Sequence, residues 1–156
     1  MAEAPDGTLW FGTNGKGLFS FNGTAWQQYT EDDGLASGSV EGVAFTPDGI
    51  LWLDVIGGLT RFDGAAFEII DPEVMGSWYG EYPDGLAVGP DGALWVLGGQ
   101  AVFRYLDGEW EVWEVVDGME LRDTASLVVG EDGSVWVSDI DGLARYGEML
   151  PVGGEG

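Results

Sequence analysis

Asp6-Gly7-Thr8-Leu9-Trp10 is the first of four copies of one short phrase in this chain of 156 residues. The other copies are Asp48-Gly49-Ile50-Leu51-Trp52, Asp91-Gly92-Ala93-Leu94-Trp95 and Asp132-Gly133-Ser134-Val135-Trp136. Their tryptophans are 42, 43 and 41 residues apart. A repeat of about 40–45 residues is typical of proteins in which each repeat forms one four-stranded sheet, called a blade.

Each copy of the phrase is followed by the same order of strand and turn signals. In the first repeat we predict strands at Leu9–Thr13, Leu18–Phe21, Trp26–Thr30 and Val40–Phe45. The last of these strands leads into the next Asp-Gly turn. Four short antiparallel strands in about 42 residues are the content of one blade.

The turns between the second and third strands carry glycine at the same place. They are Asn22-Gly23, Asp63-Gly64 and Asp107-Gly108. Such pairs are strong signals for two-residue hairpin loops, because both residues tolerate positive φ. We therefore expect a tight hairpin in each of the first three repeats.

The strands carry apolar residues on both faces, as in Leu9-Trp10-Phe11. A single sheet cannot bury both faces, but sheets stacked around an axis can. We therefore predict an all-β protein, a single β-propeller domain over 1–156 built of four tandem four-stranded antiparallel blades. The repeats run approximately over 6–47, 48–90, 91–131 and 132–156, and we expect the first and last blades to be incomplete.

The two ends of the chain differ from the repeat pattern. Only Ala2-Glu3-Ala4-Pro5 precedes Asp6, so we expect the first repeat to lack a strand of the fourth type. The tail from Glu148 has two interpretations, which both stay open. By position it is the third strand of the last blade, whereas by similarity of 150–156 to 86–92 it pairs with the first blade and closes the ring.

The composition argues against several classes of function. There is no cysteine and no histidine, which removes thiolate chemistry, the commonest general base and the commonest transition-metal ligand. We expect no cofactor and no metal site. The 28 acidic and five basic residues give a net charge of −23, which repels nucleic acids and anionic membranes. We find no signal peptide in Met1–Pro5 and no apolar run long enough to span a membrane, and the localisation stays open.

Seven residues recur at equivalent places and are interpreted as structural. We expect the repeat tryptophans to act as wedges between adjacent blades, because a large ring at one position per blade suits that role. We expect the arginines to form ion pairs with the abundant carboxylates. The tryptophans are Trp10, Trp52, Trp95 and Trp136, and the arginines are Arg61, Arg104 and Arg145.

Two acidic runs are candidates for calcium, which prefers oxygen ligands. They are Glu31-Asp32-Asp33 and Asp139-Ile140-Asp141-Gly142. Neither run belongs to a complete calcium loop motif with a downstream glutamate. We therefore interpret both as solvated loops.

The long loop over 75–84 is the segment that differs most from the repeat. Its candidate ligand-binding residues are Trp78, Tyr79, Glu81 and Tyr82, since aromatic rings beside carboxylates suit a sugar or a peptide. The alternative is that these rings pack on the blades. A pair such as Glu81 and Asp84 could hydrolyse a glycoside, but chance pairs are certain in so acidic a chain. We expect no catalytic residue and no enzyme activity.

The first repeat resembles a known family. Residues 6–18, the turn Phe21-Asn22-Gly23 and the loop 29–35 are similar to the two-component regulator propeller repeat. That resemblance implies an extracytoplasmic sensor region. The phrase Pro47-Asp48-Gly49-Ile50-Leu51-Trp52 also resembles streptogramin-lyase-like propellers, whose activity depends on a histidine that this chain lacks.

Two functions follow from these observations. In the first, the chain is a structural and interaction module that pairs with itself, and we favour a homodimer forming an eight-bladed ring over a closed four-bladed monomer. In the second, it is a sensor domain of a longer signalling protein that binds a small molecule, a peptide or a glycan through its face loops.

Overall fold

The computed structural model describes residues 1–70, 83–98, 101–114, 126–138 and 143–146. Within these ranges the backbone forms four antiparallel sheets and one short 3₁₀ helix, η1 (Glu31–Asp33). The first sheet contains β1 (Ala2–Glu3), β2 (Leu9–Gly12), β3 (Leu18–Phe21) and β4 (Trp26–Tyr29), and the second contains β5 (Val40–Phe45), β6 (Leu51–Val55), β7 (Gly58–Phe62) and β8 (Phe67–Ile69). The third contains β9 (Pro83–Val88), β10 (Leu94–Gly98), β11 (Ala101–Leu106) and β12 (Glu109–Glu114), and the fourth contains β13 (Ser126–Val129), β14 (Val135–Ser138) and β15 (Leu143–Tyr146).

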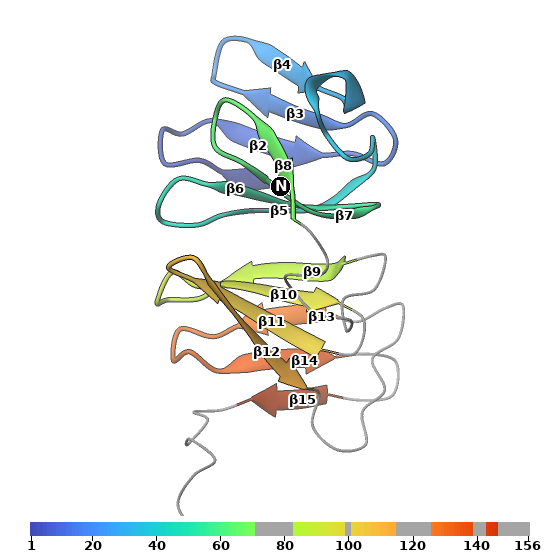
Figure 1. The fold of residues 1–156 in the computed structure, drawn as a ribbon. Coiled ribbons are helices and arrows are strands. Elements are labelled where there is room, and N and C mark those ends of the chain that lie inside the picture. Colours follow the sequence, from blue (N-terminus) through green and yellow to red (C-terminus); the bar gives the residue numbers. More distant parts are fainter. Residues whose placement is uncertain (71–82, 99–100, 115–125, 139–142, 147–156) are drawn as a thin grey trace, which may run out of the picture.

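The sheets, here called blades 1 to 4, follow one another in space in the order of the sequence (Figure 1). The first strand of each blade contacts the first strand of the next, so that β1 lies against β5, β5 against β9 and β9 against β13. The first strands therefore form the inner edge of the array. The all-β architecture predicted from the repeats, with antiparallel blades, is confirmed.

A separate hydrophobic core fills each junction between neighbouring blades. Trp10, with Leu51, Leu53 and Phe62, lies between blades 1 and 2. Trp52, with Phe103 and others, lies between blades 2 and 3. The third core is formed by Ala93, Trp95, Leu97, Val102, Leu127, Val135 and Val137. Each junction thus contains the repeat tryptophan of the preceding blade.

Strand β6 shows why both faces of an inner blade are apolar. All five of its residues are buried. Because side chains alternate along a strand, Leu51, Leu53 and Val55 enter the core toward blade 1, while Trp52 enters the core toward blade 3. The continuous apolar run in the sequence therefore belongs to a sheet covered on both sides.

The four Asp-Gly turns share one geometry. Each glycine has a positive φ, between 79° and 85°, which glycine adopts without strain. In each turn the aspartate Oδ1 accepts the backbone N–H two residues later. The distances are 2.9 Å for Asp6 to Thr8, 3.2 Å for Asp48 to Ile50, 3.1 Å for Asp91 to Ala93 and 3.0 Å for Asp132 to Ser134.

The hairpin loops correct one expectation. The two-residue loop is present at Asp107-Gly108, where both residues have positive φ and Leu106 pairs with Glu109. The loops at 22–25 and 63–66 contain four residues, since Phe21 pairs with Trp26 and Phe62 with Phe67. Their Asn22 and Asp63 instead accept two backbone N–H groups each through Oδ1, which stabilises the wider turn.

A second correction concerns blade 1, which the sequence was expected to leave without its inner strand. Ala2 and Glu3 form the two-residue strand β1 and pair with Trp10 and Leu9 of β2. The strand is short because Ala4 already belongs to the Asp-Gly turn, where its carbonyl accepts the N–H of Gly7. The tail from Glu148, with its two interpretations, lies outside the described residues.

Candidate functional site

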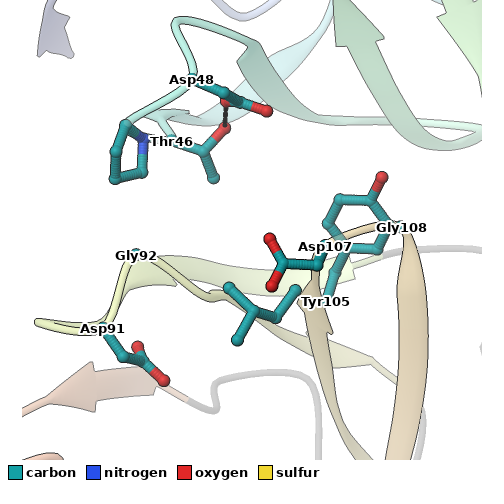
Figure 2. A pocket seen from close by; sticks show the side chains of 9 residues that line it. Thr46, Asp48, Asp91, Gly92, Tyr105, Asp107 and Gly108 are labelled. Atoms are coloured by element: carbon teal, nitrogen blue, oxygen red, sulfur yellow. Dashed lines mark hydrogen bonds between the residues drawn. The ribbon is translucent and has the colours of Figure 1, made fainter.

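A pocket of about 350 Å³ lies between blades 2 and 3, beside their Asp-Gly turns (Figure 2). Three segments line it. They are Thr46, Pro47 and Asp48 from the turn before β6, Asp91 and Gly92 from the turn before β10, and Tyr105, Leu106, Asp107 and Gly108 from the β11–β12 hairpin. In Figure 2, Thr46 and Asp48 lie on one side of the space, and Asp91, Tyr105 and Asp107 lie on the other.

The wall of the pocket that blade 2 provides, with Thr46 and Asp48, is fixed by a chain of hydrogen bonds. The Trp52 indole donates from Nε1 to Thr46 Oγ1 at 3.1 Å, and Thr46 Oγ1 donates to Asp48 Oδ1 at 2.6 Å. Trp52 is 1% exposed. A buried indole therefore holds the hydroxyl, and the hydroxyl orients a carboxylate at the pocket.

The carboxylate of Asp91 is held by Arg104 at 2.8 Å. Burial alone raises the pKa of Asp91, but the hydrogen bonds from Arg104 and the Ala93 N–H outweigh it and hold the pKa below its ordinary value. Arg104 also pairs with Glu111 at 2.9 Å. Asp91 is therefore ionised at neutral pH and forms an ion pair with Arg104 beside the pocket.

Tyr105 supplies an aromatic wall. Its ring lies 5.1 Å from the ring of Trp52 and 4.8 Å from that of Trp110, centroid to centroid. Both neighbours belong to the blade 2–3 junction and hold the ring in place. The pocket thus combines a fixed apolar surface with carboxylate oxygens, which accept hydrogen bonds from hydroxyl or amino groups.

A related pocket of about 250 Å³ occupies the equivalent place between blades 1 and 2. It contains Ala4, Pro5 and Asp6 where the first pocket has Thr46, Pro47 and Asp48. The same type of cavity therefore occurs at two successive junctions of the described chain.

A third pocket, of about 320 Å³, lies beside blade 1 and includes part of the acidic run at 31–33. These acidic residues bond locally: Asp33 Oδ2 accepts the Thr30 N–H at 2.8 Å, and Glu31 Oε1 accepts the Gly38 N–H at 3.1 Å. Within the described ranges there is no group of three or more acidic side chains placed to hold a metal ion. The second run, 139–142, lies outside them.

The other candidate residues from the sequence are distributed as follows. The four candidate ligand-binding residues of the long loop lie outside the described residues; they are Trp78, Tyr79, Glu81 and Tyr82.

The repeat tryptophans differ in burial, and the repeat arginines all form ion pairs. The exposed fraction is at most 8% for Trp10, Trp52 and Trp95, whereas it is 37% for Trp136. The arginines pair with carboxylates: Arg61 with Glu68 at 2.6 Å, Arg104 as above, and Arg145 with Asp132 at 3.2 Å.

The pocket residues Thr46, Asp48, Tyr105 and Asp107 were not singled out from the sequence. Asp48 and Asp107 were recognised as turn residues, but their meeting across a blade junction depends on how the blades stack. The signal in the sequence is weak: residues of two neighbouring repeats must be compared position by position.

No protein-family profile matches the chain, and no curated protein matches it. Several solved structures match the chain in fold. The extracellular domain of the hybrid two-component system BT3049 from B. thetaiotaomicron matches with a TM-score of 0.74 at 14% identity, over 96% of this chain and 21% of that one. The extracellular domain of BT4673 from the same organism matches with a TM-score of 0.78 at 19% identity, over 95% and 22%.

Virginiamycin B lyase from Staphylococcus aureus matches with a TM-score of 0.63 at 16% identity, over 96% of this chain and 55% of the enzyme. The shared feature is the β-propeller fold. This chain spans about a fifth of the two extracellular domains, and the same fold also carries an enzyme. In the part of the chain that the structure describes, no helix has the length and apolar character to cross a bilayer.

Proposed function

We propose that this chain is the ligand-binding propeller portion of an extracytoplasmic sensor, and that it binds a small polar molecule or a glycan between its blades. The observation that carries the proposal is the pocket between blades 2 and 3, where the ring of Tyr105 and the carboxylates of Asp48, Asp91 and Asp107 line one space. The resemblance to extracellular domains of two-component systems supports the sensor role.

The chemistry of the pocket favours binding over catalysis. A general acid needs a proton at working pH, and so a raised pKa. The pKa of Asp91 is instead lowered, because Arg104 and a backbone N–H stabilise its carboxylate. A carboxylate that is ionised at neutral pH accepts hydrogen bonds from a ligand, and the ring of Tyr105 offers a surface for the ligand's apolar face.

A thermal-shift screen of neutral mono- and oligosaccharides and small polar metabolites tests this proposal. At least one compound should raise the melting temperature, because a ligand that binds only the folded state stabilises it. Asp107→Asn should abolish the shift. Glu109→Gln, on the same hairpin but outside the pocket, should preserve it. A screen without any shift, or an Asp107→Asn variant that keeps the response, would refute the proposal.

A specific observation also favours self-assembly as a second function. The outward face of blade 4 exposes Val128 at 59%, Trp136 at 37% and Leu143 at 65%. Blade 1 carries an aromatic cluster on its own outward face, where Trp26 is 62% exposed and lies 4.8 Å from the ring of Phe21. We propose that these two faces pair between two copies, as Trp10 and Trp52 pack on the next blade within the chain.

Solution mass tests this pairing. Light scattering should give twice the chain mass of 16.6 kDa. Trp136→Glu should yield a monomer, because a charge would be buried without a partner. Ile69→Glu, an equal change at an exposed position of β8, should leave the dimer intact. A wild-type monomer would exclude the eight-bladed ring.

A further inference from the structure

The indole N–H of Trp10 has no hydrogen-bond partner, although its nitrogen is buried and Trp10 is only 8% exposed. A buried donor without an acceptor costs free energy, and native proteins rarely leave one unpaired. The unpaired N–H therefore marks a place in the fold where an acceptor is missing.

Blades 2 and 4 show what is missing. Thr46, six residues before Trp52, accepts the indole N–H of that tryptophan. In blade 4, Ser134 accepts from Trp136 at 3.0 Å. Blade 1 has Ala4, which carries no hydroxyl, at the place of Thr46. Thr8 stands at the place of Ser134 and is hydrogen-bonded with Asp6, as Ser134 is with Asp132, but it does not accept the indole N–H of Trp10.

The loss of the hydroxyl changes the pocket between blades 1 and 2. In the blade 2–3 pocket, Thr46 lines the cavity and Trp52 is not among the lining residues. In the blade 1–2 pocket, both Ala4 and Trp10 line the cavity. In blade 1, where Ala4 stands at the place of Thr46, the side chain of Trp10 is itself part of the wall of the cavity of about 250 Å³.

The remaining lining residues include two phenylalanines and an acidic pair, together with Thr8. Phe45 and Phe62 lie 6.2 Å and 5.8 Å from Trp10, centroid to centroid. Tyr29 stacks on the indole at 5.4 Å, so one face of that ring is covered. Asp6 and Asp63 provide the carboxylates of the pocket.

Both carboxylates are ionised at neutral pH. The pKa of Asp6 is lowered mainly by the backbone N–H of Thr8, and that of Asp63 by the N–H groups of Ala66 and Ala65. A carboxylate has about four lone-pair positions, so these bonds leave capacity for a ligand. The net charge of −23 favours the approach of a cation.

We propose that the blade 1–2 pocket binds a small organic cation that carries a carbonyl oxygen. The oxygen accepts the Trp10 Nε1–H, and the ammonium group lies against Asp6 and Asp63. The apolar part of the molecule packs on Phe45 and Phe62. This site deepens the proposed sensor function but is separate from the pocket of Tyr105 and Asp107.

Nuclear magnetic resonance of the ¹⁵N-labelled chain tests the proposal through the Trp10 indole signal, assigned with Trp10→Phe. Glycinamide, with an ammonium and a carbonyl group, should shift that signal in a saturable manner. Acetamide, which lacks the ammonium group, should bind at least about tenfold more weakly, since one charge-assisted contact is worth about a factor of ten. Equal responses to the two probes would overturn the assignment of a cation.

Ala4→Thr is the decisive variant, because blade 2 already carries threonine at that place. It should supply the missing acceptor, remove the response to glycinamide and leave the fold intact. Ala25→Thr, in an exposed hairpin, should respond like the unmodified chain. An Ala4→Thr variant that still responds would overturn the proposal.

Asp63→Asn gives a second measurement that does not depend on Ala4. The fold should tolerate it, because Asn22 makes the same turn contacts in blade 1. The affinity for glycinamide should fall about tenfold with the lost charge. An unchanged affinity, or no saturable shift in the unmodified chain, would refute the site. Neither result depends on the screen proposed for the blade 2–3 pocket.

Discussion

Thr46 and Trp52 are joined by a hydrogen bond of 3.1 Å from the indole Nε1 to the threonine Oγ1, and the same hydroxyl donates to Asp48 at 2.6 Å. Thr46 is 6% exposed and Trp52 is 1% exposed. The hydroxyl therefore satisfies a buried donor and connects the core of a blade junction to the edge of a pocket.

Thr46→Val should lower the free energy of unfolding by about 1–3 kcal/mol, because the indole N–H would be left buried without an acceptor. Valine keeps the branched shape, so little packing is lost. Urea unfolding followed by tryptophan fluorescence measures the effect. Thr24→Val, in an exposed hairpin, should change the stability by much less. Equal effects of the two variants would contradict the role of the hydrogen bond.

Trp52→Ala should cost roughly 3–5 kcal/mol as a truncation in a closed core. Trp136→Ala should cost clearly less in a monomeric sample, because Trp136 is 37% exposed and no described blade covers it. Denaturant titration of both variants at low protein concentration gives the comparison. A cost for Trp136→Ala as large as that for Trp52→Ala would show that its face is covered.

The ion pair of Asp91 with Arg104 predicts a loss of stability in acid. The folded pKa of Asp91 is lowered, so its contribution is present above the unfolded pKa and is lost as the pH falls through the folded value. The melting temperature should decline below about pH 4. Asp91→Asn should show a smaller decline over that range. Parallel curves for the two proteins would argue against the linkage.

Gly15 and Gly17 form a matched pair, since both have positive φ, 90° and 79°. A methyl group at Gly17 would overlap the carbonyl oxygen of Tyr29, whereas one at Gly15 would meet nothing within 4 Å. Gly15→Ala should therefore cost only the backbone strain, about 1 kcal/mol, and Gly17→Ala considerably more. Thermal unfolding of the two variants checks the order, and a larger cost at Gly15 would reverse the interpretation.

Much of the blade architecture is accessible from the sequence, because it depends on local rules. The four Asp-Gly turns are visible because aspartate bonds its own backbone and glycine tolerates positive φ. The apolar run Leu51-Trp52-Leu53 indicates a strand covered on both faces. The hairpin loops were less accessible: Asn22 and Asp63 stabilise four-residue turns, while Asp107 makes a two-residue turn, and the dipeptides look alike.

The repeat, the order of the strands and the tryptophan that each of blades 1 to 3 places against the next blade can be predicted from the sequence alone. These follow from the spacing of the tryptophans and from alternation along a strand, both of which are short-range properties. The stacking of the blades was needed to show that Asp48, Asp91 and Asp107 border one pocket and that Trp10 lacks the acceptor present for Trp52. Both depend on how neighbouring blades meet, and a single difference, Ala4 against Thr46, becomes meaningful only when the two junctions are compared in space.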